Sequence, residues 1–413
     1  MIKYFFILGT NPLISIAEIF SFAKTNKTTL NIIDVTSHIL IIESKEIDIN
    51  KWQAYLGGTI KIGLIINKYQ NINDLLKSVN TETLLNNFFK QTTQKIIFGF
   101  SLYSTSLTHY QNKIKSLGIK IKQDLQKLDY KSRFIMAKSQ ALTAVQINKN
   151  KILQQGADIV IAESANGLYI GVTKTIQDFE DYSDRDFGRP QRDAKSGMIP
   201  PKLAKIMINL GGVSSDDLLL DPFCGSGTII QEALLMNINN VIGSDISQKA
   251  INDTKNNIDW LTQKYSLTNI NISLYTEDVQ TLDNDIDSST VDKIVTEPYL
   301  GPQDHSENNQ DKINSTINEL EKLYLAAFQT FKKITKPSST IVIVFPLIII
   351  DQDIHVLKIL EKINNLGFIR IDPIPENISL FAKIGVTARG SMIYQRPGQR
   401  VQREIFIFKK TKN

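Results

Sequence analysis

Cysteine is almost absent from this chain, whose 413 residues include one, Cys224. A lone thiol excludes an internal disulfide bond and any zinc site built from cysteines. The chain also lacks an uninterrupted apolar run of about 18 residues, the length that a membrane span needs. The nearest candidate, Ile341 to Ile350, is too short and contains Pro346. We therefore expect a cytoplasmic protein in a reducing compartment, with no membrane span and no metal site.

The length of the chain exceeds what one hydrophobic core can organise, so two or three domains are expected. Residues 1–60 read as a small α+β unit that ends at Gly57-Gly58, and residues 61–176 read as a second region. Residues 177–196 are charged and interrupted by glycine and proline, which is typical of a linker. Residues 197–413 form the remaining region.

Charge is unevenly distributed along the chain, although the net value is only +5. Between Lys95 and Lys151 there are 11 basic residues and two acidic ones. Within this stretch, residues 111–128 are expected to form an amphipathic helix whose lysines lie mostly off the apolar stripe. Such an excess favours a polyanionic partner, most simply nucleic acid, and a solvated lysine-rich surface explains it equally well.

Helical and strand-like segments alternate regularly after residue 197, which predicts a doubly wound, mostly parallel α/β sheet. A helix is expected over residues 355–366, and the strands at 391–394 and 405–408 are expected to form an antiparallel hairpin at the sheet edge. Earlier in the chain, Asn166-Gly167 lies between two apolar runs, which is a strong hairpin signal. Four arginines near the C-terminal strands suit either phosphate contacts or a solvated edge that discourages strand pairing: Arg389, Arg396, Arg400 and Arg403.

The segment LLLDPFCGSGTII, residues 218–230, reads as a strand that ends in an acid, followed by a glycine-rich loop and a helix. Ligands of such folds bind at the carboxyl ends of the strands, near helix N-termini. Gly225 and Gly227 allow a ligand to approach the backbone closely. The third glycine of a dinucleotide loop is missing, and so is the Gly-Lys-Ser/Thr ending of a phosphate loop.

Acidic residues follow three successive expected strands: Asp221, Asp245 and Asp278. Asp221 would repel a pyrophosphate but suits a cationic ligand such as S-adenosylmethionine, which carries an ammonium and a sulfonium group. Asp245 is in position for a ribose diol, and Asp278 for an adenine amine. Each acid alone is explained as readily by a turn or a helix cap. Three of them around one glycine loop favour an S-adenosylmethionine site.

Several motifs resemble those of class I amino-methyltransferases: DPFCGSGTI, GSDIS and a later strand that ends in Pro298-Tyr299. GRPQRDAKSGMIPPKLAKIMINLGG, residues 188–212, is similar to the segment that leads into the catalytic domain of THUMP-domain tRNA guanine-N2 methyltransferases of the guanosine-10 type. FILGTNPLISIAEI at 6–19 and QRVQREIFIFKK at 399–410 resemble the opening and closing segments of that family. The resemblance therefore covers nearly the whole chain.

This resemblance implies a ferredoxin-like region at 1–60, a THUMP RNA-binding domain at 61–176 and a Rossmann-like class I methyltransferase domain at 197–413. It implies tRNA as the partner, with a small activating subunit in some relatives, and does not indicate an oligomeric state. It places Asp245 at the ribose, Asp278 at the adenine, and Pro200 beside the methionine end. The implied S-adenosylmethionine-binding residues are Asp221, Pro222, Phe223, Cys224, Gly225, Gly227, Thr228, Asp245, Ile246, Asp278, Val279 and Pro200.

The turn VTEPYLGP, residues 295–302, corresponds to the substrate-binding turn of the family. There, a first-position Asp or Asn and the carbonyl of the second residue accept hydrogen bonds from the target amine, a proline stiffens the turn, and an aromatic ring stacks on the base. Pro298 and Tyr299 match this pattern, whereas Thr296 and Glu297 stand where Asp or Asn and Pro are usual. Three interpretations stay open: Glu297 replaces the missing acid, Thr296 and the carbonyl of residue 297 suffice, or the protein is inactive or acts on another base.

We therefore expect an RNA methyltransferase that acts on the N2 amine of a guanosine in tRNA, at position 10. The expected catalytic residues are Thr296, Glu297, Pro298 and Tyr299. One alternative is another RNA amine, either ribosomal guanine N2 or adenine N6. The other is a catalytically weak tRNA-binding protein that keeps the methyltransferase fold.

Overall fold

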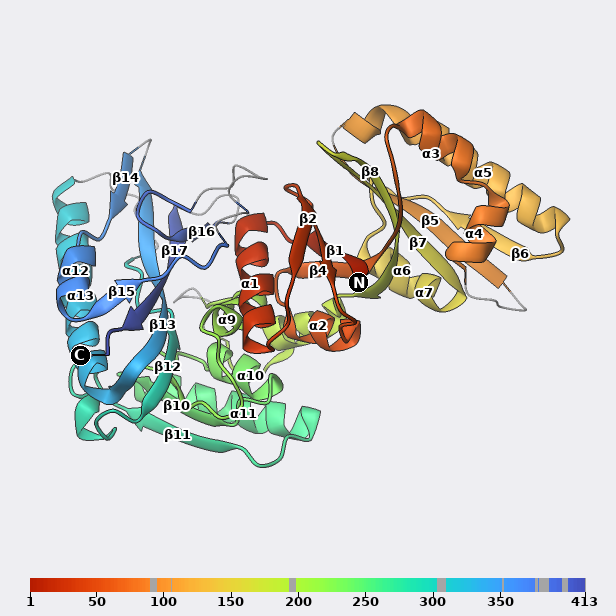
Figure 1. The fold of residues 1–413 in the computed structure, drawn as a ribbon. Coiled ribbons are helices and arrows are strands. Elements are labelled where there is room, and N and C mark those ends of the chain that lie inside the picture. Colours follow the sequence, from red (N-terminus) through yellow and green to blue (C-terminus); the bar gives the residue numbers. More distant parts are fainter. Residues whose placement is uncertain are drawn as a thin grey trace.

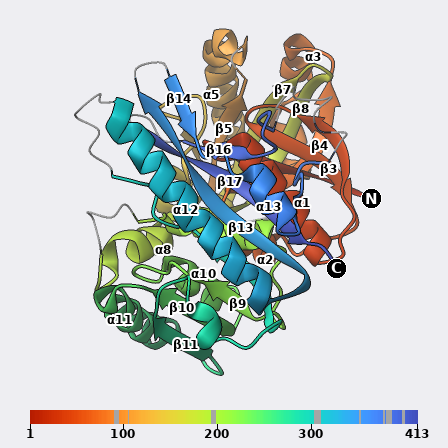
Figure 2. The same cartoon turned by 90° about the vertical axis from the view of Figure 1, so that its left-hand side faces the viewer.

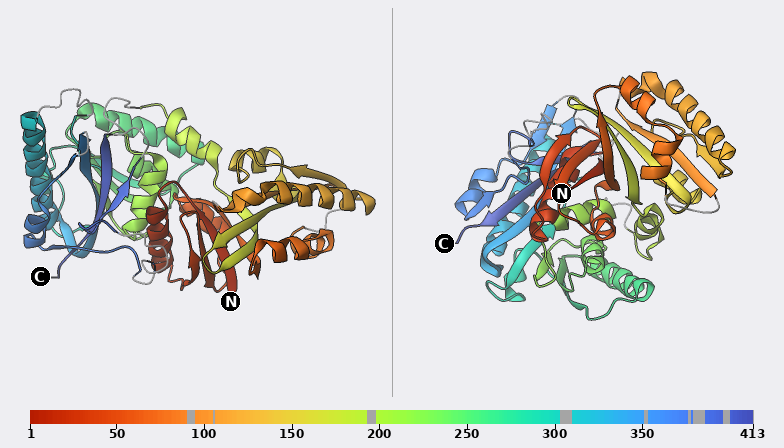
Figure 3. Two further views of the ribbon diagram at one scale, coloured as in Figure 1. Left: turned by 90° about the horizontal axis from the view of Figure 1, so that it is seen from above. Right: turned by 45° about the vertical axis from the view of Figure 1, so that its right-hand side comes forward.

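Two β-sheets organise the chain in the computed structural model, one in each half (Figure 1). Seen from above, the two halves lie side by side in an elongated molecule (Figure 3). The structure describes residues 1–89, 95–104, 106–192, 198–302, 310–350, 353–375, 378, 386–395 and 400–412. Within those residues the first sheet has eight strands and the second has nine.

The N-terminal sheet has the strand order β2-β3-β1-β4-β8-β7-β5-β6, so strands from residues 1–60 and 61–176 belong to one sheet. The predicted hairpin is confirmed by the pairing of Ser164 with Gly167. The assignment of these residues to a ferredoxin-like region and a THUMP domain stays a prediction. The elements of this half are β1 (Ile2–Leu8), α1 (Pro12–Thr25), β2 (Asn31–Val35), β3 (Ile39–Ser44), α2 (Ile49–Tyr55), β4 (Thr59–Tyr69), α3 (Ile72–Ser78), α4 (Thr81–Asn87), β5 (Lys95–Tyr103), η1 (Ser106–Tyr110), α5 (Gln111–Lys127), β6 (Lys131–Ile135), α6 (Ala144–Lys149), α7 (Ile152–Gln155), β7 (Gly156–Ser164) and β8 (Gly167–Ile176).

The basic helix forms as predicted and is α5. It buries Ile114, Ile121 and Leu125 against the sheet, because apolar residues at helical spacing share one face. Four of its lysines are exposed on the other face: Lys113, Lys115, Lys120 and Lys127. Helices α3, α4 and α5 lie together over this end of the sheet (Figure 1).

The second sheet has the order β11-β10-β9-β12-β13-β17-β15, with β14 beside β13 and β16 beside β17. The pairs among β9 to β13 are parallel, and the chain leaves β9 first toward β10 and later toward β12. Ligands of such sheets bind where the strand order reverses, here between β9 and β12. The elements are α9 (Pro201–Leu210), β9 (Leu219–Asp221), α10 (Thr228–Leu235), β10 (Asn240–Asp245), α11 (Gln248–Tyr265), β11 (Asn271–Thr276), η3 (Leu282–Asn284), β12 (Val291–Thr296), α12 (Gln310–Ile334), β13 (Thr335–Ile350), β14 (Asp353–Val356), α13 (Leu360–Asn365), β15 (Phe368–Arg370), β16 (Met392–Tyr394) and β17 (Val401–Lys410).

The antiparallel pairing expected between the last two strands is confirmed, because Met392 of β16 pairs with Ile405 of β17. Two other expectations in this half are wrong. The last strand, β17, is not an edge strand, because it pairs with β13 on one side and with β15 and β16 on the other. Its alternate residues enter two different cores, Ile405 and Ile407 on one face and Phe406 and Phe408 on the opposite face. The helix expected over residues 355–366 is shorter, since strand β14 continues to Val356 and α13 begins at Leu360.

Helices cover both faces of the second sheet. Helix α12 runs along one face, across β13 and β17 (Figure 2). Helices α9, α10 and α11 cover the other, and α1 of the N-terminal half packs against α9 on that side (Figure 1). The carboxylate of Glu18 in α1 accepts hydrogen bonds from the amides of Gly57 and Gly58, at 2.7 and 2.8 Å, and from Nδ2 of Asn209 in α9, at 2.8 Å. This buried contact joins the two halves.

The segment expected as a linker is packed rather than extended. It contains helix α8 (Phe179–Ser183) and a turn of π-helix, η2 (Asp184–Gly188). Arg185 is buried there, and its Nε donates to Glu232 of α10 at 2.6 Å. Ion pairing therefore holds residues 179–188 against the C-terminal half.

Candidate active site

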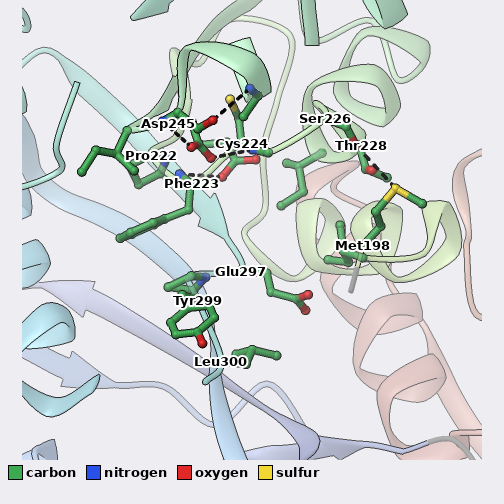
Figure 4. Close-up of a pocket in the computed structure, with 18 of the residues that line it drawn as sticks. Met198, Pro222, Phe223, Cys224, Ser226, Thr228, Asp245, Glu297, Tyr299 and Leu300 are labelled. Atoms are coloured by element: carbon green, nitrogen blue, oxygen red, sulfur yellow. Dashed lines mark hydrogen bonds between the residues drawn. The ribbon is translucent and has the colours of Figure 1, made fainter. Parts of the chain in front are cut away.

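A cavity of about 790 Å³ opens at the carboxyl ends of β9, β10 and β12. Figure 4 shows the loop from Pro222 to Thr228 and Asp245 on one side of it, and Glu297, Tyr299 and Leu300 on the other. This is the position that the reversal of strand order predicts for a ligand.

The glycine-rich loop after β9 presents backbone to the cavity. Gly225 has a left-handed φ of +54°, and a Cβ built there would meet no described atom within 4 Å. Gly227 has a φ of +79°, but a Cβ there would lie 2.8 Å from the methyl group of Thr254. Gly225 therefore leaves room for a ligand, whereas Gly227 is needed for the packing of α10 on α11.

Asp221 is a buried carboxylate at the end of β9. Its Oδ1 accepts a hydrogen bond of 2.7 Å from the hydroxyl of Thr296, and no lysine or arginine among the described residues forms an ion pair with it. Burial raises its pKa from 3.8 to about 7, although the bonds from Thr296 and Phe223 act in the opposite direction. A carboxylate in this position is suited to a cationic ligand.

The other two acids surround the same cavity. Asp245 accepts from the backbone amides of Gly225, at 3.0 Å, and Ser247, at 2.9 Å. It therefore fixes the shape of the glycine loop besides facing the cavity. Asp278 accepts from the amide of Gln280 at 2.9 Å and is half-buried.

The turn after β12 is divided between the core and the cavity. Thr296 is fully buried below the cavity and donates to Asp221, whereas Glu297, Pro298 and Tyr299 line the cavity. Tyr299 is 58% exposed, so one face of its ring is accessible. The hydroxyl of Thr296 is thus committed to Asp221.

Glu297 forms a two-point ion pair with Arg403 of β17. Nε of Arg403 lies 2.5 Å from one carboxylate oxygen, and Nη2 lies 2.8 Å from the other. Both side chains are under 10% exposed, at 8% for Glu297 and 7% for Arg403. Among the described residues, Arg403 is the cation that forms an ion pair with the Glu297 carboxylate.

A second arginine holds the segment that precedes α9. Arg189 is buried, and its Nη1 donates to Oγ1 of Thr228 at 2.6 Å, while Nη2 lies 2.8 Å from Sδ of Met198. Burial lowers its pKa from the ordinary value. Arg189 therefore ties Met198, which lines the cavity, to Thr228 at the start of α10.

Several named proteins are similar to parts of this chain in sequence. A chain from Methanothermococcus thermolithotrophicus, named "Probable tRNA (guanine(10)-N2)-dimethyltransferase", is 32% identical over 124 residues, which cover 29% of this chain and 74% of that relative. This chain belongs to the class I tRNA guanine-N2 methyltransferase family. Two further relatives named tRNA (guanine(10)-N2)-dimethyltransferase come from Methanothermobacter thermautotrophicus and Methanocaldococcus jannaschii. They are 40% identical over 105 residues and 31% identical over 181 residues.

The match spans less than half of the length of those two relatives, at 28% and 48%, and covers 25% and 43% of this chain. A family model described as "RMKL-like, methyltransferase domain" matches residues 189–349, and a broader one described as "DNA methylase" matches residues 18–256.

The fold of this family member is shared with a solved structure over its whole length. TrmN from Thermus thermophilus superposes with a TM-score of 0.55 over 99% of both chains, at 12% identity. The expected α/β architecture with a Rossmann-like methyltransferase domain is therefore confirmed.

Most residues expected in the site of this family member line the cavity. The expected residues that line it are Asp221, Pro222, Phe223, Cys224, Gly225, Thr228, Asp245, Ile246, Asp278, Val279, Glu297, Pro298 and Tyr299. Gly227, Thr296 and Pro200 do not: the first two lie behind the wall, and Pro200 is the N-cap of α9.

Sequence reasoning missed two kinds of lining residue. Ile199, next to the expected Pro200, carries no chemical signal of its own. Arg403 was expected either to contact phosphate or to lie on a solvated edge, and it is instead buried against Glu297. Arg400 also lines the cavity, while Arg396 lies outside the described residues.

The described residues contain no cluster of three or more His, Cys, Asp and Glu side chains that could hold a metal ion. Among the same residues, no helix is long and apolar enough to cross a membrane.

Proposed function

We propose that this protein transfers a methyl group from S-adenosylmethionine to the exocyclic N2 amine of a guanosine in tRNA, at position 10. The observation that carries the proposal is one cavity that joins a glycine-rich loop and Asp221 to the turn Glu297-Pro298-Tyr299. The names of the relatives support the tRNA substrate and the position of the guanosine.

The residues around the cofactor end of the cavity suit S-adenosylmethionine, which supplies an electrophilic methyl group on a sulfonium centre. Asp221 would face its positive charge in a site where solvent does not compensate the carboxylate. The open space beside Gly225 would admit the methionine part. Asp245 and Asp278 would accept from the ribose hydroxyls and the adenine amine, respectively.

The residues at the other end suit a flat base that carries an amine. An exocyclic amine is a poor nucleophile, because its lone pair is delocalised into the ring. The site must therefore hold the amine with acceptors and stack the base. Tyr299 offers an accessible ring, and the carboxylate and carbonyl of Glu297 offer acceptors. Pro298 favours an extended backbone at Glu297.

The N-terminal half supplies a surface for the RNA. We propose that residues 61–176 act as a THUMP domain after a ferredoxin-like region at 1–60, and that the exposed lysines of α5 contact phosphates. Residues 197–413 would form the catalytic domain.

Methyl transfer to unmodified tRNA transcripts tests the proposal. The protein is incubated with labelled S-adenosylmethionine and a transcript, and the nucleosides are identified by mass spectrometry. We expect N2-methylated guanosine with wild-type transcript and loss of the product when guanosine 10 is replaced by adenosine. Methyl-guanosine at another position, methyl-adenosine, or no transfer to any RNA would overturn it, the last in favour of a tRNA-binding protein without the chemistry.

A further inference from the structure

We propose that Arg403 is a positioning residue for methyl transfer, which holds the carboxylate of Glu297 as the side-chain acceptor for the target amine. The inference rests on the proposed function and adds to it a residue from a distant part of the chain.

Arg403 contacts the carboxylate of Glu297 at two points. The two nitrogens Nε and Nη2 of Arg403 reach different oxygens of Glu297, at 2.5 and 2.8 Å. Such fork-like pairing fixes the orientation of a carboxylate, which a single contact does not. Arg403 is itself held on an interior strand, where it is paired with Pro346 of β13 and Tyr394 of β16.

The position of Glu297 explains why its side chain needs to be restrained. Thr296, the last residue of β12, directs its hydroxyl to Asp221 and away from the cavity. The side chain of this turn that brings a carboxylate to the cavity wall is therefore that of Glu297. It has one more rotatable bond than the Asp or Asn that is usual at the first position of the turn. Ordering such a side chain costs entropy, and an unrestrained carboxylate would be aimed poorly. The ion pair with Arg403 removes that freedom before the substrate binds.

The pairing leaves acceptor capacity on Glu297. A carboxylate has about four lone-pair sites, and the two bonds from Arg403 use two of them. Burial alone would lower the pKa of Arg403, but the hydrogen bonds and charge of Glu297 raise it above its ordinary value, so the cation persists.

The role of the pair in the reaction is to orient the amine. In the transfer, the amine nitrogen gains a bond to the methyl carbon while the bond from that carbon to sulfur breaks, and sulfur keeps the electron pair. One amine proton then leaves to water at the cavity mouth. Glu297 would accept a hydrogen bond from the amine and direct its lone pair toward the methyl group.

A double-mutant cycle tests the inference. The turnover number and the KM for S-adenosylmethionine are measured with saturating tRNA for Glu297→Gln, Arg403→Gln and the double variant. We expect each single variant to lower kcat by about 100-fold, in the range typical of a lost positioning or acid–base contact. The double variant should be no slower than Glu297→Gln, because Arg403 acts only through Glu297. Binding of S-adenosylmethionine, measured by calorimetry, should stay within about threefold of wild type.

Arg389→Gln provides the matched control. Arg389 forms an ion pair with Glu404, the neighbour of Arg403 on β17, through one nitrogen rather than two, and does not line the cavity. It should leave kcat near the wild-type value and combine additively with Glu297→Gln. If Arg403→Gln fails to fold, Arg403→Lys, which keeps the charge but loses the fork, should still lower kcat measurably.

Other outcomes would overturn the inference. An unchanged kcat in Arg403→Gln, or in Arg403→Lys where that variant replaces it, would do so. So would a double variant slowed by about 10,000-fold, as independent effects would multiply. Absence of transfer by the wild-type protein would instead overturn the proposed function, so that the two failures are distinguishable.

Discussion

Binding of S-adenosylmethionine should depend on pH through Asp221. Burial raises the pKa of this carboxyl to about 7 in the free protein, and a cationic ligand binds the ionised form. Raising the pH through 7 therefore ionises Asp221 and strengthens binding, and lowering the pH protonates it and weakens binding. About one tenth of the protein is ionised at pH 6 and about nine tenths at pH 8, so the dissociation constant should fall by about tenfold, or about 1.4 kcal/mol.

Isothermal titration calorimetry at pH 6, 7 and 8 measures this change. Repeating the titration in two buffers of different ionisation enthalpy also measures the number of protons released on binding. At pH 7 this number should be about half a proton per ligand, because about half of the Asp221 carboxyl groups are protonated before binding. Asp221→Asn keeps an acceptor for Thr296 but cannot ionise, so its affinity should be lower and independent of pH. Wild-type affinity that stays constant over this range, or strengthens as pH falls, would refute the assignment of Asp221 to the cation.

Three further predictions concern other parts of the molecule. Gly225→Ala should cost only about 1 kcal/mol of stability, for the left-handed φ, yet weaken S-adenosylmethionine binding strongly in calorimetry. Gly227→Ala should instead lower the melting temperature through its clash within the fold. Burial raises the pKa of Glu18 to about 7, so the native state binds more protons than the unfolded state between pH 4.5 and 7, and stability falls as pH rises. Glu18→Gln should remove about 3 kcal/mol of that dependence in urea unfolding; an identical pH dependence in both proteins would contradict this. Replacing Lys113 and Lys120 by glutamine should lower the salt dependence of tRNA affinity by about one unit of slope each if both contact phosphates, whereas an unchanged slope would exclude α5 from the interface.

Local patterns were sufficient to predict the strand, glycine-rich loop and helix that form one wall of the cavity. The loop from Asp221 to Thr228 is contiguous, and its glycines, acid and following helix obey rules that act over a few residues. The hairpin at Asn166-Gly167 and the amphipathic helix α5 were predicted for the same reason.

The substrate side was predicted incompletely, because it depends on pairing between distant strands. Thr296 was expected to face the substrate, but the twist and register of β12 direct it to Asp221. Glu297 and Arg403 are 106 positions apart, and nothing local to either residue indicates the other. His355 and Val356, the last residues of the short strand β14, were likewise assigned to a helix, since periodicity distinguishes the two structures poorly over a few residues.

The sequence by itself determined the type of fold, the cofactor loop and the family, because these follow from spacing and side-chain chemistry along continuous segments. Tertiary structure alone decided that Glu297 rather than Thr296 lines the cavity, and that Arg403 holds its carboxylate. That outcome depends on β17 entering the interior of the sheet beside β13, where burial removes water from Arg403 and Glu297 and makes each the partner of the other. Such a pairing is selected by the packing of two sheet faces, and it has no signature in either segment alone.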